Sequence, residues 1–163
     1  MAGWHAAGET VALVPTMGAI HDGHLSLVRA GQLSADRVVV SLFVNPMQFG
    51  ANEDFTSYPA DEAADKAALS RASVDTIYAP TLSAIYPEGF MTRVSVDGLA
   101  SRLCGSHRPG HFDGVTTVVT KLLLQCNPEI ALFGEKDYQQ LQIIRRMVRD
   151  LDIPVAIQGV PTL

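Results

Sequence analysis

The feature that most constrains the fold is an alternation between short apolar runs and segments with helical spacing. Residues 38–44 (VVVSLFV) are almost continuously apolar, which is typical of a parallel strand covered by helices on both faces. The runs of strand length are 11–14, 38–44, 74–79, 130–133 and 155–157, with a further short strand expected at 93–96. Helical spacing occurs at 25–33, 60–72, 115–126 and 141–151. Strands that alternate with helices predict an α/β domain with a doubly wound, Rossmann-like parallel sheet. Pro15 is expected to end the first strand, and residues 104–114 are expected to form a loop.

Length and charge restrict the class of protein further. The 163 residues predict a single domain over 1–163. The net charge of −5 leaves no basic stripe to neutralise phosphates, so we expect neither a nucleic-acid nor a membrane partner. No apolar run approaches the roughly 18–20 residues of a membrane-spanning helix, and the first residues lack the pattern of a signal peptide. Two cysteines without Cys-x-x-Cys spacing suit a reducing compartment, so a cytoplasmic location is expected.

Unusual polar turns follow three of the predicted strands. They are residues 15–18 (PTMG), 45–49 (NPMQF) and 134–137 (GEKD). In doubly wound sheets, ligands bind outside the carboxyl ends of the strands, where the strand order reverses. The three turns are therefore expected to meet in one ligand site.

Two histidines, His21 and His24, open the first long helical segment in the string His-Asp-Gly-His. The start of a helix favours an anion, and two imidazoles three residues apart can both point at a phosphate. Two other interpretations remain open at this point. Asp22 could cap the helix with both histidines on the surface, or the histidines could bind zinc. The zinc interpretation lacks further ligands, because His111 and Cys126 lie in other elements without ligand-like spacing.

Residues 16–24 resemble the HIGH-type signature of the nucleotidyl-transferring α/β superfamily. Four further blocks, at 43–49, 58–59, 108–115 and 133–140, resemble the pantothenate synthetase (pantoate–β-alanine ligase) family in the same order and at matching separations. On these five blocks the chain is identified as a member of that family.

The resemblance implies an ATP-dependent ligase. Pantoate and ATP would give pantoyl adenylate and pyrophosphate, and the amine of β-alanine would then displace AMP to give pantothenate. It also implies Mg²⁺, held through the ATP phosphates, a homodimer and a cytoplasmic location. A carboxylate nucleophile is already ionised near neutral pH, so no general base is required.

The resemblance further implies roles for particular residues. Catalysis falls to His24 as proton donor, with His21 and Lys136 neutralising phosphate charge, and no residue is assigned to a metal. Pantoate would be bound by Gln48, Gln140 and Asn45, with Asn45 orienting its turn and Gln48 also near β-alanine. The implied ATP-binding residues are Met17, Gly18, Ala19, Ile20, His21, Asp22, Gly23, His24, Gly134, Glu135, Lys136, Asp137 and Leu163. Independently of the resemblance, the apolar side chains of Phe43, Phe49 and Met17 are expected either to wall the pocket or to belong to the core.

The match to the family pattern has limits. Family members continue past the position of Leu163 into a serine-rich ATP loop and a smaller C-terminal lid domain, and they begin with a first helix of which this chain looks short. The chain is therefore expected to be the N-terminal ATP- and pantoate-binding domain, which binds its ligands but turns over poorly. Cys104 stands where many members have an acidic residue, and Arg108 is expected near the phosphates or a dimer face. Another HIGH-type nucleotidyltransferase and a non-catalytic nucleotide-binding module remain as alternatives.

Overall fold

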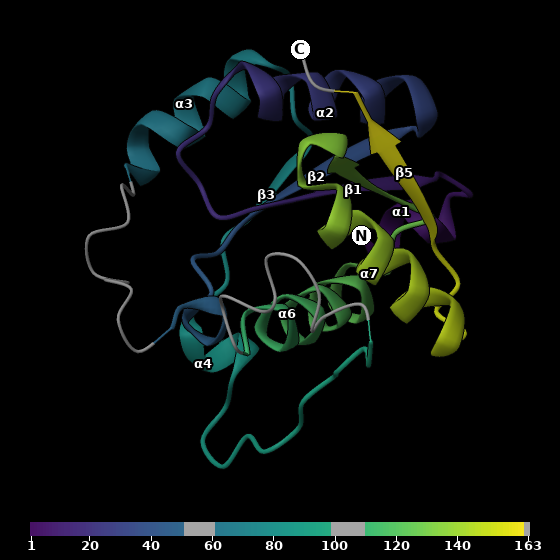
Figure 1. Ribbon diagram of the computed structural model, residues 1–163. Helices are drawn as coiled ribbons and strands as arrows, with labels where there is room; N and C mark the ends of the chain where they lie inside the picture. The colour runs from purple at the N-terminus through teal and green to yellow at the C-terminus, as the bar shows by residue number, and fades with distance from the viewer. Residues whose placement is uncertain (51–60, 99–109, 162–163) are drawn as a thin grey trace.

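The computed structural model describes residues 1–50, 61–98 and 110–161 (Figure 1). Its centre is one sheet of five parallel strands in the order β3-β2-β1-β4-β5. The strands are β1 (Val11–Thr16), β2 (Arg37–Leu42), β3 (Thr76–Tyr78), β4 (Ile130–Gly134) and β5 (Ala156–Val160). The order reverses between β1 and β4, so the switch point of the sheet lies between these two central strands.

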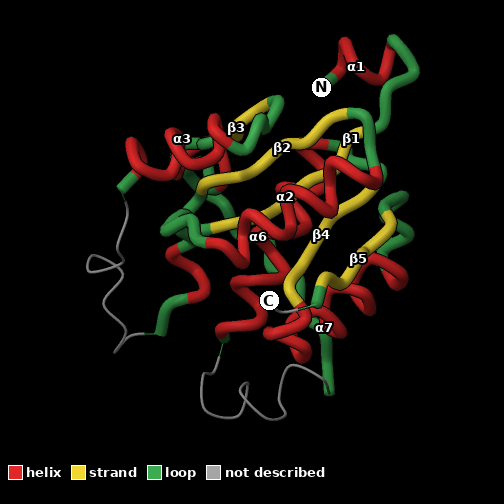
Figure 2. Tube along the Cα trace, turned by 90° about the horizontal axis from the view of Figure 1, so that it is seen from above, coloured by secondary structure: helices red, strands yellow, loops and turns green. Residues whose placement is uncertain are grey.

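Helices cover both faces of the sheet. They are α1 (Ala2–Ala6), α2 (Asp22–Ser34), α3 (Glu62–Arg71), α4 (Leu82–Ile85), α6 (His111–Cys126) and α7 (Tyr138–Asp150), with short 3-10 helices η1 (Pro46–Gln48) and η3 (Glu135–Asp137). Figure 1 shows α2 and α3 on one side of the sheet and α6 and α7 on the other, and Figure 2 shows the sheet from above. The prediction of a doubly wound α/β sheet is confirmed.

Alternate residues of each strand enter two separate cores. Val11 and Leu13 of β1 pack with α6 and α7, whereas Ala12 and Val14 pack with α2 and α3. All four are fully buried. Because both faces of β1 are buried, its sequence shows no alternation between apolar and polar residues.

Three local predictions differ from the structure. Pro15 does not end the first strand: it pairs with Ser41 of β2. The pairing of β1 with β4 ends at Leu13, so a residue without an N–H is tolerated there. Residues 93–96 are not a strand, because Val94 bonds to the side chains of Thr116 and Thr117 in α6.

The third difference concerns the start of α6. Residues 111–114 were predicted to belong to a loop, but they form the first turn of this helix. Gly110, with φ of +80°, precedes the helix, and Gly114 lies inside it. Glycines so close together imitate a loop in the sequence.

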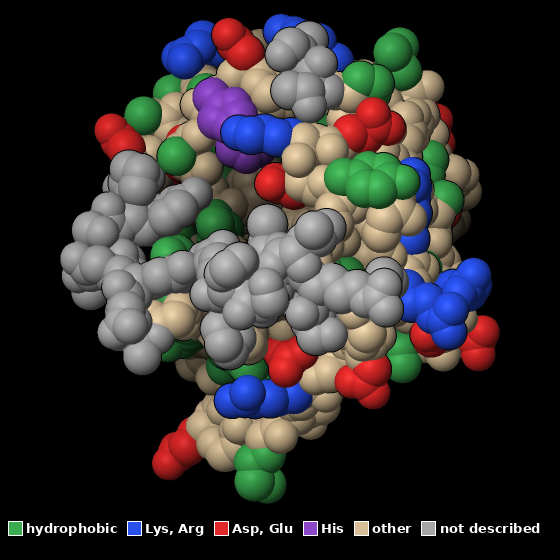
Figure 3. Space-filling model, in the orientation of Figure 1, with side chains coloured by type: hydrophobic (Ala, Val, Ile, Leu, Met, Phe, Trp, Pro, Cys, Tyr) green, Lys and Arg blue, Asp and Glu red, His purple; other side chains and the backbone are tan. Residues whose placement is uncertain are grey.

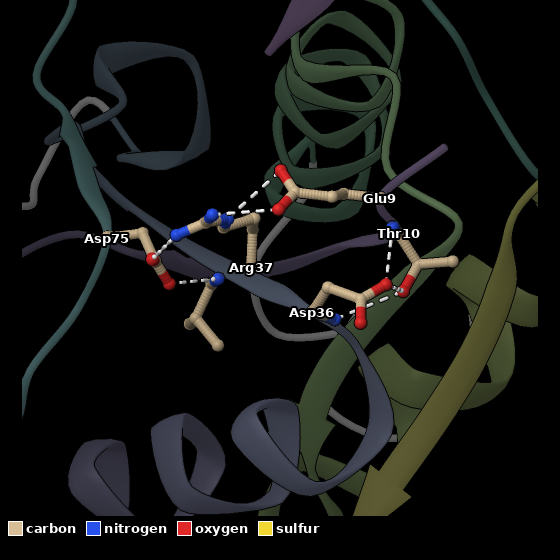
Figure 4. A network of polar contacts seen from close by, with 6 residues as sticks. Glu9, Thr10, Asp36, Arg37 and Asp75 are labelled. Atoms are coloured by element: carbon tan, nitrogen blue, oxygen red, sulfur yellow. Dashed lines mark hydrogen bonds and ion pairs between the residues drawn. The ribbon is translucent and has the colours of Figure 1, made fainter. Parts of the chain in front are cut away.

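The amino ends of the strands are tied together by a polar network (Figure 4). Arg37 donates to both carboxylate oxygens of Glu9, at 3.2 and 2.8 Å, and to Asp75 at 3.0 Å. Asp36 accepts from the backbone and hydroxyl of Thr10 at 2.8 and 2.7 Å, and these bonds hold the pKa of Asp36 below its usual value. This network lies at the opposite end of the sheet from the three polar turns.

None of the helices in the described ranges is both long and apolar enough to cross a membrane.

Candidate functional site

A cavity of about 630 Å³ lies at the carboxyl ends of β1, β2 and β4. Its wall includes five of the side chains on which the sequence interpretation most depends: His21, His24, Gln48, Lys136 and Gln140. Figure 3 shows histidine and basic side chains next to one another on one face of the molecule. The three separate turns therefore lie at one cavity, as the sequence predicts, and the roles assigned to their residues stay predictions.

The other residues named from the sequence divide into three groups. The wall also includes Met17, Asp22, Gly23, Phe43, Asn45, Gly134 and Asp137. Four residues assigned to ATP and one assigned to the pocket wall are not among its lining: Gly18, Ala19, Ile20, Glu135 and Phe49. The predictions for Leu163, Arg108, Cys104 and the Tyr58–Pro59 block lie outside the described residues.

The first turn has a strained backbone that a buried carboxylate holds in place. Gly18 and Ala19 have φ values of +90° and +52°, and this region of φ is unfavourable for alanine. The carboxylate of Asp65 in α3 accepts hydrogen bonds from the backbone of Ala19 at 2.9 Å and of Ile20 at 2.7 Å. A Cβ atom at position 18 would lie 2.7 Å from this carboxylate, so glycine is required there.

His21 caps helix α2 directly. Its Nδ1 accepts a hydrogen bond from the backbone N–H of Gly23 at 3.0 Å, so its neutral ring carries the proton on Nε2. Asp22 is the first residue inside the helix rather than its cap. The interpretation of an Asp22 cap is therefore wrong, and the carboxylate adds charge near the positive end of the helix dipole.

His24 lies against His21, with ring centroids 4.1 Å apart and an interplanar angle of 36°. Burial, reinforced by His21 and opposed by Asp65, lowers the pKa of His24 to about 4. Its Nδ1 is buried without a hydrogen-bond partner within the described part of the chain. A neutral imidazole with an unsatisfied nitrogen in a cavity wall is well placed to meet a polar ligand.

The second turn is organised around Asn45, which is 1 % exposed. Its Nδ2 donates to the Gln48 Oε1 at 3.1 Å and to the Gly114 carbonyl at 3.0 Å. Its Oδ1 accepts from the Tyr86 hydroxyl at 2.8 Å and from the Met47 backbone at 3.3 Å. The Gln48 Nε2 then faces the Met17 sulfur at 3.0 Å.

Helix α6 packs against this second turn. His111 Nδ1 lies 2.8 Å from the carbonyl oxygen of Gln48, and since a carbonyl only accepts, the ring nitrogen donates. A Cβ atom at Gly114 would lie 2.3 Å from the Met47 carbonyl oxygen and 2.6 Å from the Gln48 nitrogen. Glycine at 114 thus lets α6 approach η1 closely.

The third turn supplies Lys136 and Gln140. Lys136 is exposed, and within the described residues no carboxylate pairs with it. Gln140 is half-buried in the first turn of α7, and its side chain has no hydrogen-bond partner in the same ranges. Both side chains line the cavity with their polar groups free for a ligand.

A protein-built metal cage is not seen in residues 1–50, 61–98 and 110–161, where no three His, Cys, Asp or Glu side chains cluster suitably. Asp22 and Asp137 do line the cavity. One or two carboxylates beside a phosphate are the donor set that Mg²⁺ takes when it is carried by a nucleotide. The lining therefore fits a metal that arrives with its phosphates.

Sequence reasoning missed two residues at this site. Asp65 lies four residues before the fully buried Leu69 and is itself 6 % exposed, so a carboxylate on the apolar face of a predicted helix was the available signal. Tyr86 is in a stretch without periodicity, and nothing in the sequence pointed to it.

The fold and cavity together define an α/β domain of the doubly wound class, with a cavity at the switch point of its sheet. A family model described as pantoate-beta-alanine ligase matches residues 1–163. The pantothenate synthetase of Paramagnetospirillum magneticum is 65 % identical over 160 residues, which are 98 % of this chain and 56 % of that protein. The chain belongs to the pantoate–β-alanine ligase family, and it spans about 56 % of the length of that relative.

Solved structures agree with this assignment. The pantothenate synthetase from Thermus thermophilus is 53 % identical, with a TM-score of 0.94 over 99 % of this chain and 60 % of that one. The pantoate-beta-alanine ligase from Francisella tularensis, crystallised in complex with beta-gamma ATP and beta-alanine, is 41 % identical. Its TM-score is 0.92, covering 96 % of this chain and 60 % of that one.

Proposed function

We propose that this chain is the nucleotide- and hydroxy-acid-binding part of an enzyme that joins pantoate to β-alanine at the expense of ATP. One observation carries the proposal: His21, His24, Gln48, Lys136 and Gln140, from three separate turns, line one cavity. The Francisella tularensis relative, crystallised with beta-gamma ATP and beta-alanine, supports it.

The proposed reaction has two displacements. A pantoate carboxylate oxygen attacks the α-phosphorus of ATP, the bond to the bridging oxygen breaks, and pyrophosphate leaves. The unprotonated amine of β-alanine then attacks the acyl carbon and gives up one proton to solvent as the amide forms. The acyl carbon–oxygen bond breaks, and AMP leaves with the former carboxylate oxygen. The first displacement brings two anions together, so it needs charge neutralisation and alignment more than a base.

The nucleotide is assigned to the first and third turns. The start of α2 offers free backbone N–H groups and the positive end of a helix dipole. The Lys136 ammonium adds a compact charge suited to phosphate. His24, neutral when no ligand is bound, gains affinity for a proton as phosphate charge approaches, and it can then donate that proton to the developing charge.

The hydroxy acid is assigned to Gln48 and Gln140, with Gln48 also next to β-alanine. An amide binds hydroxyls and a carboxylate without adding charge. Phe43 and Met17 supply apolar wall beside them. Mg²⁺, carried by the phosphates, would neutralise part of their charge, and Asp22 and Asp137 are the carboxylates that could complete its coordination.

The proposal extends to the protein's setting. As in the resemblance drawn from the sequence, we assign the protein to the cytoplasm, as a homodimer without nucleic-acid or membrane partners. The described chain is assigned as one N-terminal domain that binds its ligands and turns over slowly, since an exposed acyl adenylate is open to water.

An isotope experiment tests the reaction. The chain is mixed with ATP, Mg²⁺, β-alanine and pantoate labelled with ¹⁸O in both carboxylate oxygens, and the AMP is analysed by mass spectrometry. The proposal predicts AMP that carries one ¹⁸O atom, and pyrophosphate exchange into ATP that requires pantoate. Unlabelled AMP would contradict an acyl-adenylate route. A nucleotidyl-linked product that persists when β-alanine is added would favour a nucleotidyltransferase, and absence of exchange would favour a binding module.

A further inference from the structure

The side chains of Tyr86, Asn45 and Gln48 form a continuous hydrogen-bonded chain, here called the amide relay. It runs from Tyr86, which is not among the lining residues, to Asn45 and Gln48 in the cavity wall. None of the comparisons assigns a role to Tyr86. Its ring is held by Phe43 and Phe90, with centroids at 6.2 and 5.1 Å. Its hydroxyl reaches Asn45 at 2.8 Å.

The orientation of the Asn45 amide is fixed by two backbone groups of unambiguous type. The Met47 N–H can only donate, so the atom 3.3 Å from it is the acceptor Oδ1. The Gly114 carbonyl can only accept, so the atom 3.0 Å from it is the donor Nδ2. Tyr86 must therefore donate to Oδ1, and burial keeps it able to do so, because it raises the pKa of Tyr86 to about 12.

The orientation of Gln48 follows from that of Asn45. The second Nδ2 proton of Asn45 points at the Gln48 amide, so the atom at 3.1 Å is the acceptor Oε1. The Gln48 Nε2 is then on the other side, where one of its two protons meets only the weak acceptor sulfur of Met17 at 3.0 Å. Within the described residues, every polar atom of the Asn45 side chain has a partner, whereas one proton of the Gln48 Nε2 has none.

We propose that Tyr86 and Asn45 are positioning residues that make Gln48 a hydrogen-bond donor toward the cavity. The partner of this donor is an acceptor group of the ligand, a carboxylate or hydroxyl oxygen of the hydroxy acid. The identity of that ligand rests on the proposed function, while the orientation of the relay does not. Asn45 then acts through Gln48 and does not touch the ligand.

Nuclear magnetic resonance of the ¹⁵N-labelled 163-residue chain tests the relay without any ligand. The proposal predicts a nuclear Overhauser effect between the Gln48 side-chain NH₂ and the Met17 methyl group. In Asn45→Asp the new carboxylate oxygen would draw the Gln48 NH₂ toward position 45, and this effect should disappear. If it is absent from the wild-type chain, or persists in Asn45→Asp, the relay is wrong.

Tyr86→Phe provides a second variant should Asn45→Asp fail to fold. It removes one of the two donors to Asn45 Oδ1, so the Asn45 and Gln48 NH₂ resonances should shift and their solvent exchange should quicken. Tyr78→Phe is the matched control, because it removes a bond of similar length, 3.0 Å to Gln125, away from the cavity lining. If the Asn45 and Gln48 NH₂ resonances are the same in Tyr86→Phe as in Tyr78→Phe, the proposal is wrong.

Titration with pantoate and, separately, ATP distinguishes this inference from the proposed function. Asn45→Asp should raise the pantoate Kd by roughly tenfold or more. In this variant the Gln48 amide turns its NH₂ toward position 45, so its oxygen rather than its NH₂ faces the pantoate carboxylate. The ATP Kd should change less than about twofold, because the nucleotide is assigned to the first and third turns and Asn45 and Gln48 belong to the second. An unchanged pantoate Kd would contradict the positioning role. If pantoate shifts no resonance of the wild-type chain, the proposed function fails, and the Overhauser effect still decides the relay.

Discussion

The His21 and His24 rings lie with centroids 4.1 Å apart at the start of α2, and only His21 has a hydrogen bond that fixes its tautomer among the described residues. Two protonated rings this close would repel each other. Burial and this neighbour together lower the pKa of His24 to about 4. Without a ligand, the His24 ring is therefore neutral near neutral pH, and a bound anion would raise its affinity for a proton.

The pKa of His24 is accordingly expected to depend on the nucleotide. NMR titration of its ring should give a value near 4 in the free chain and a clearly higher one with saturating ATP, because phosphate charge stabilises imidazolium. A value near 6.5 in the free chain, the ordinary one for histidine, or no change with ATP, would contradict the assigned role.

The same lowered pKa affects folding. The unfolded chain binds more protons than the native chain between about pH 6.5 and pH 4, so this histidine's contribution to stability is lost as the pH falls through that window. Urea unfolding at several pH values should show a smaller loss of stability in His24→Gln than in the wild-type chain. Parallel losses in the two chains would mean that His24 titrates normally.

Asp65→Asn should loosen the turn before α2. The amide can accept from only one of the two N–H groups of Ala19 and Ile20, and its NH₂ would face the other. We expect a loss of about 1–3 kcal/mol in the free energy of unfolding, measured by urea denaturation, and weaker ATP binding. Asp61→Asn is the control: Asp61 caps α3, and asparagine caps almost as well. Equal losses in both variants would contradict the special role of Asp65.

Gly114→Ala should disturb the Gln48 turn. The added Cβ would lie 2.3 Å from a backbone oxygen, so α6 and η1 must move apart, at a cost of about 1–3 kcal/mol. Calorimetry should show weaker pantoate binding together with lower thermal stability. Gly3→Ala, whose Cβ meets nothing within 4 Å, should leave pantoate binding unchanged. If Gly114→Ala binds pantoate as tightly as the wild-type chain, the close approach of α6 to η1 does not shape the pantoate site.

Arg37→Gln should lower the thermal midpoint without changing ligand binding. Arg37 bridges Glu9 and Asp75 at the amino ends of the strands, and these carboxylates hold its pKa above the usual value. The difference from the wild-type chain should shrink in high salt, because the bridge is partly exposed. A changed ATP or pantoate affinity would show that the two ends of the sheet are coupled.

Most of the strands and the location of the cavity could be predicted because each depends on local chemistry. A run such as 38–44 is apolar whichever fold surrounds it, and polar turns after parallel strands must lie on the same edge of the sheet. The HDGH string similarly marks a helix start from its own residues.

What the sequence did not reveal depends on contacts between distant segments. Asp65 is 46 residues from Ala19 and 45 from Ile20, and Tyr86 is 41 residues from Asn45. The strand predicted at 93–96 was wrong because its backbone bonds to threonine side chains of α6. An alternation of polar and apolar residues, as at 93–96, predicts an extended chain, but it does not show whether that chain bonds to another strand or to side chains.

In the proposed function, one cavity holds the nucleotide and the hydroxy acid together. The decisive experiment is a crystal structure of the chain with a non-hydrolysable ATP analogue and pantoate. We expect phosphate oxygens within hydrogen-bond distance of His24 and Lys136, and pantoate oxygens facing the Gln48 Nε2 and Gln140. Ligands bound on another face, or pantoate without contact to either glutamine, would contradict it.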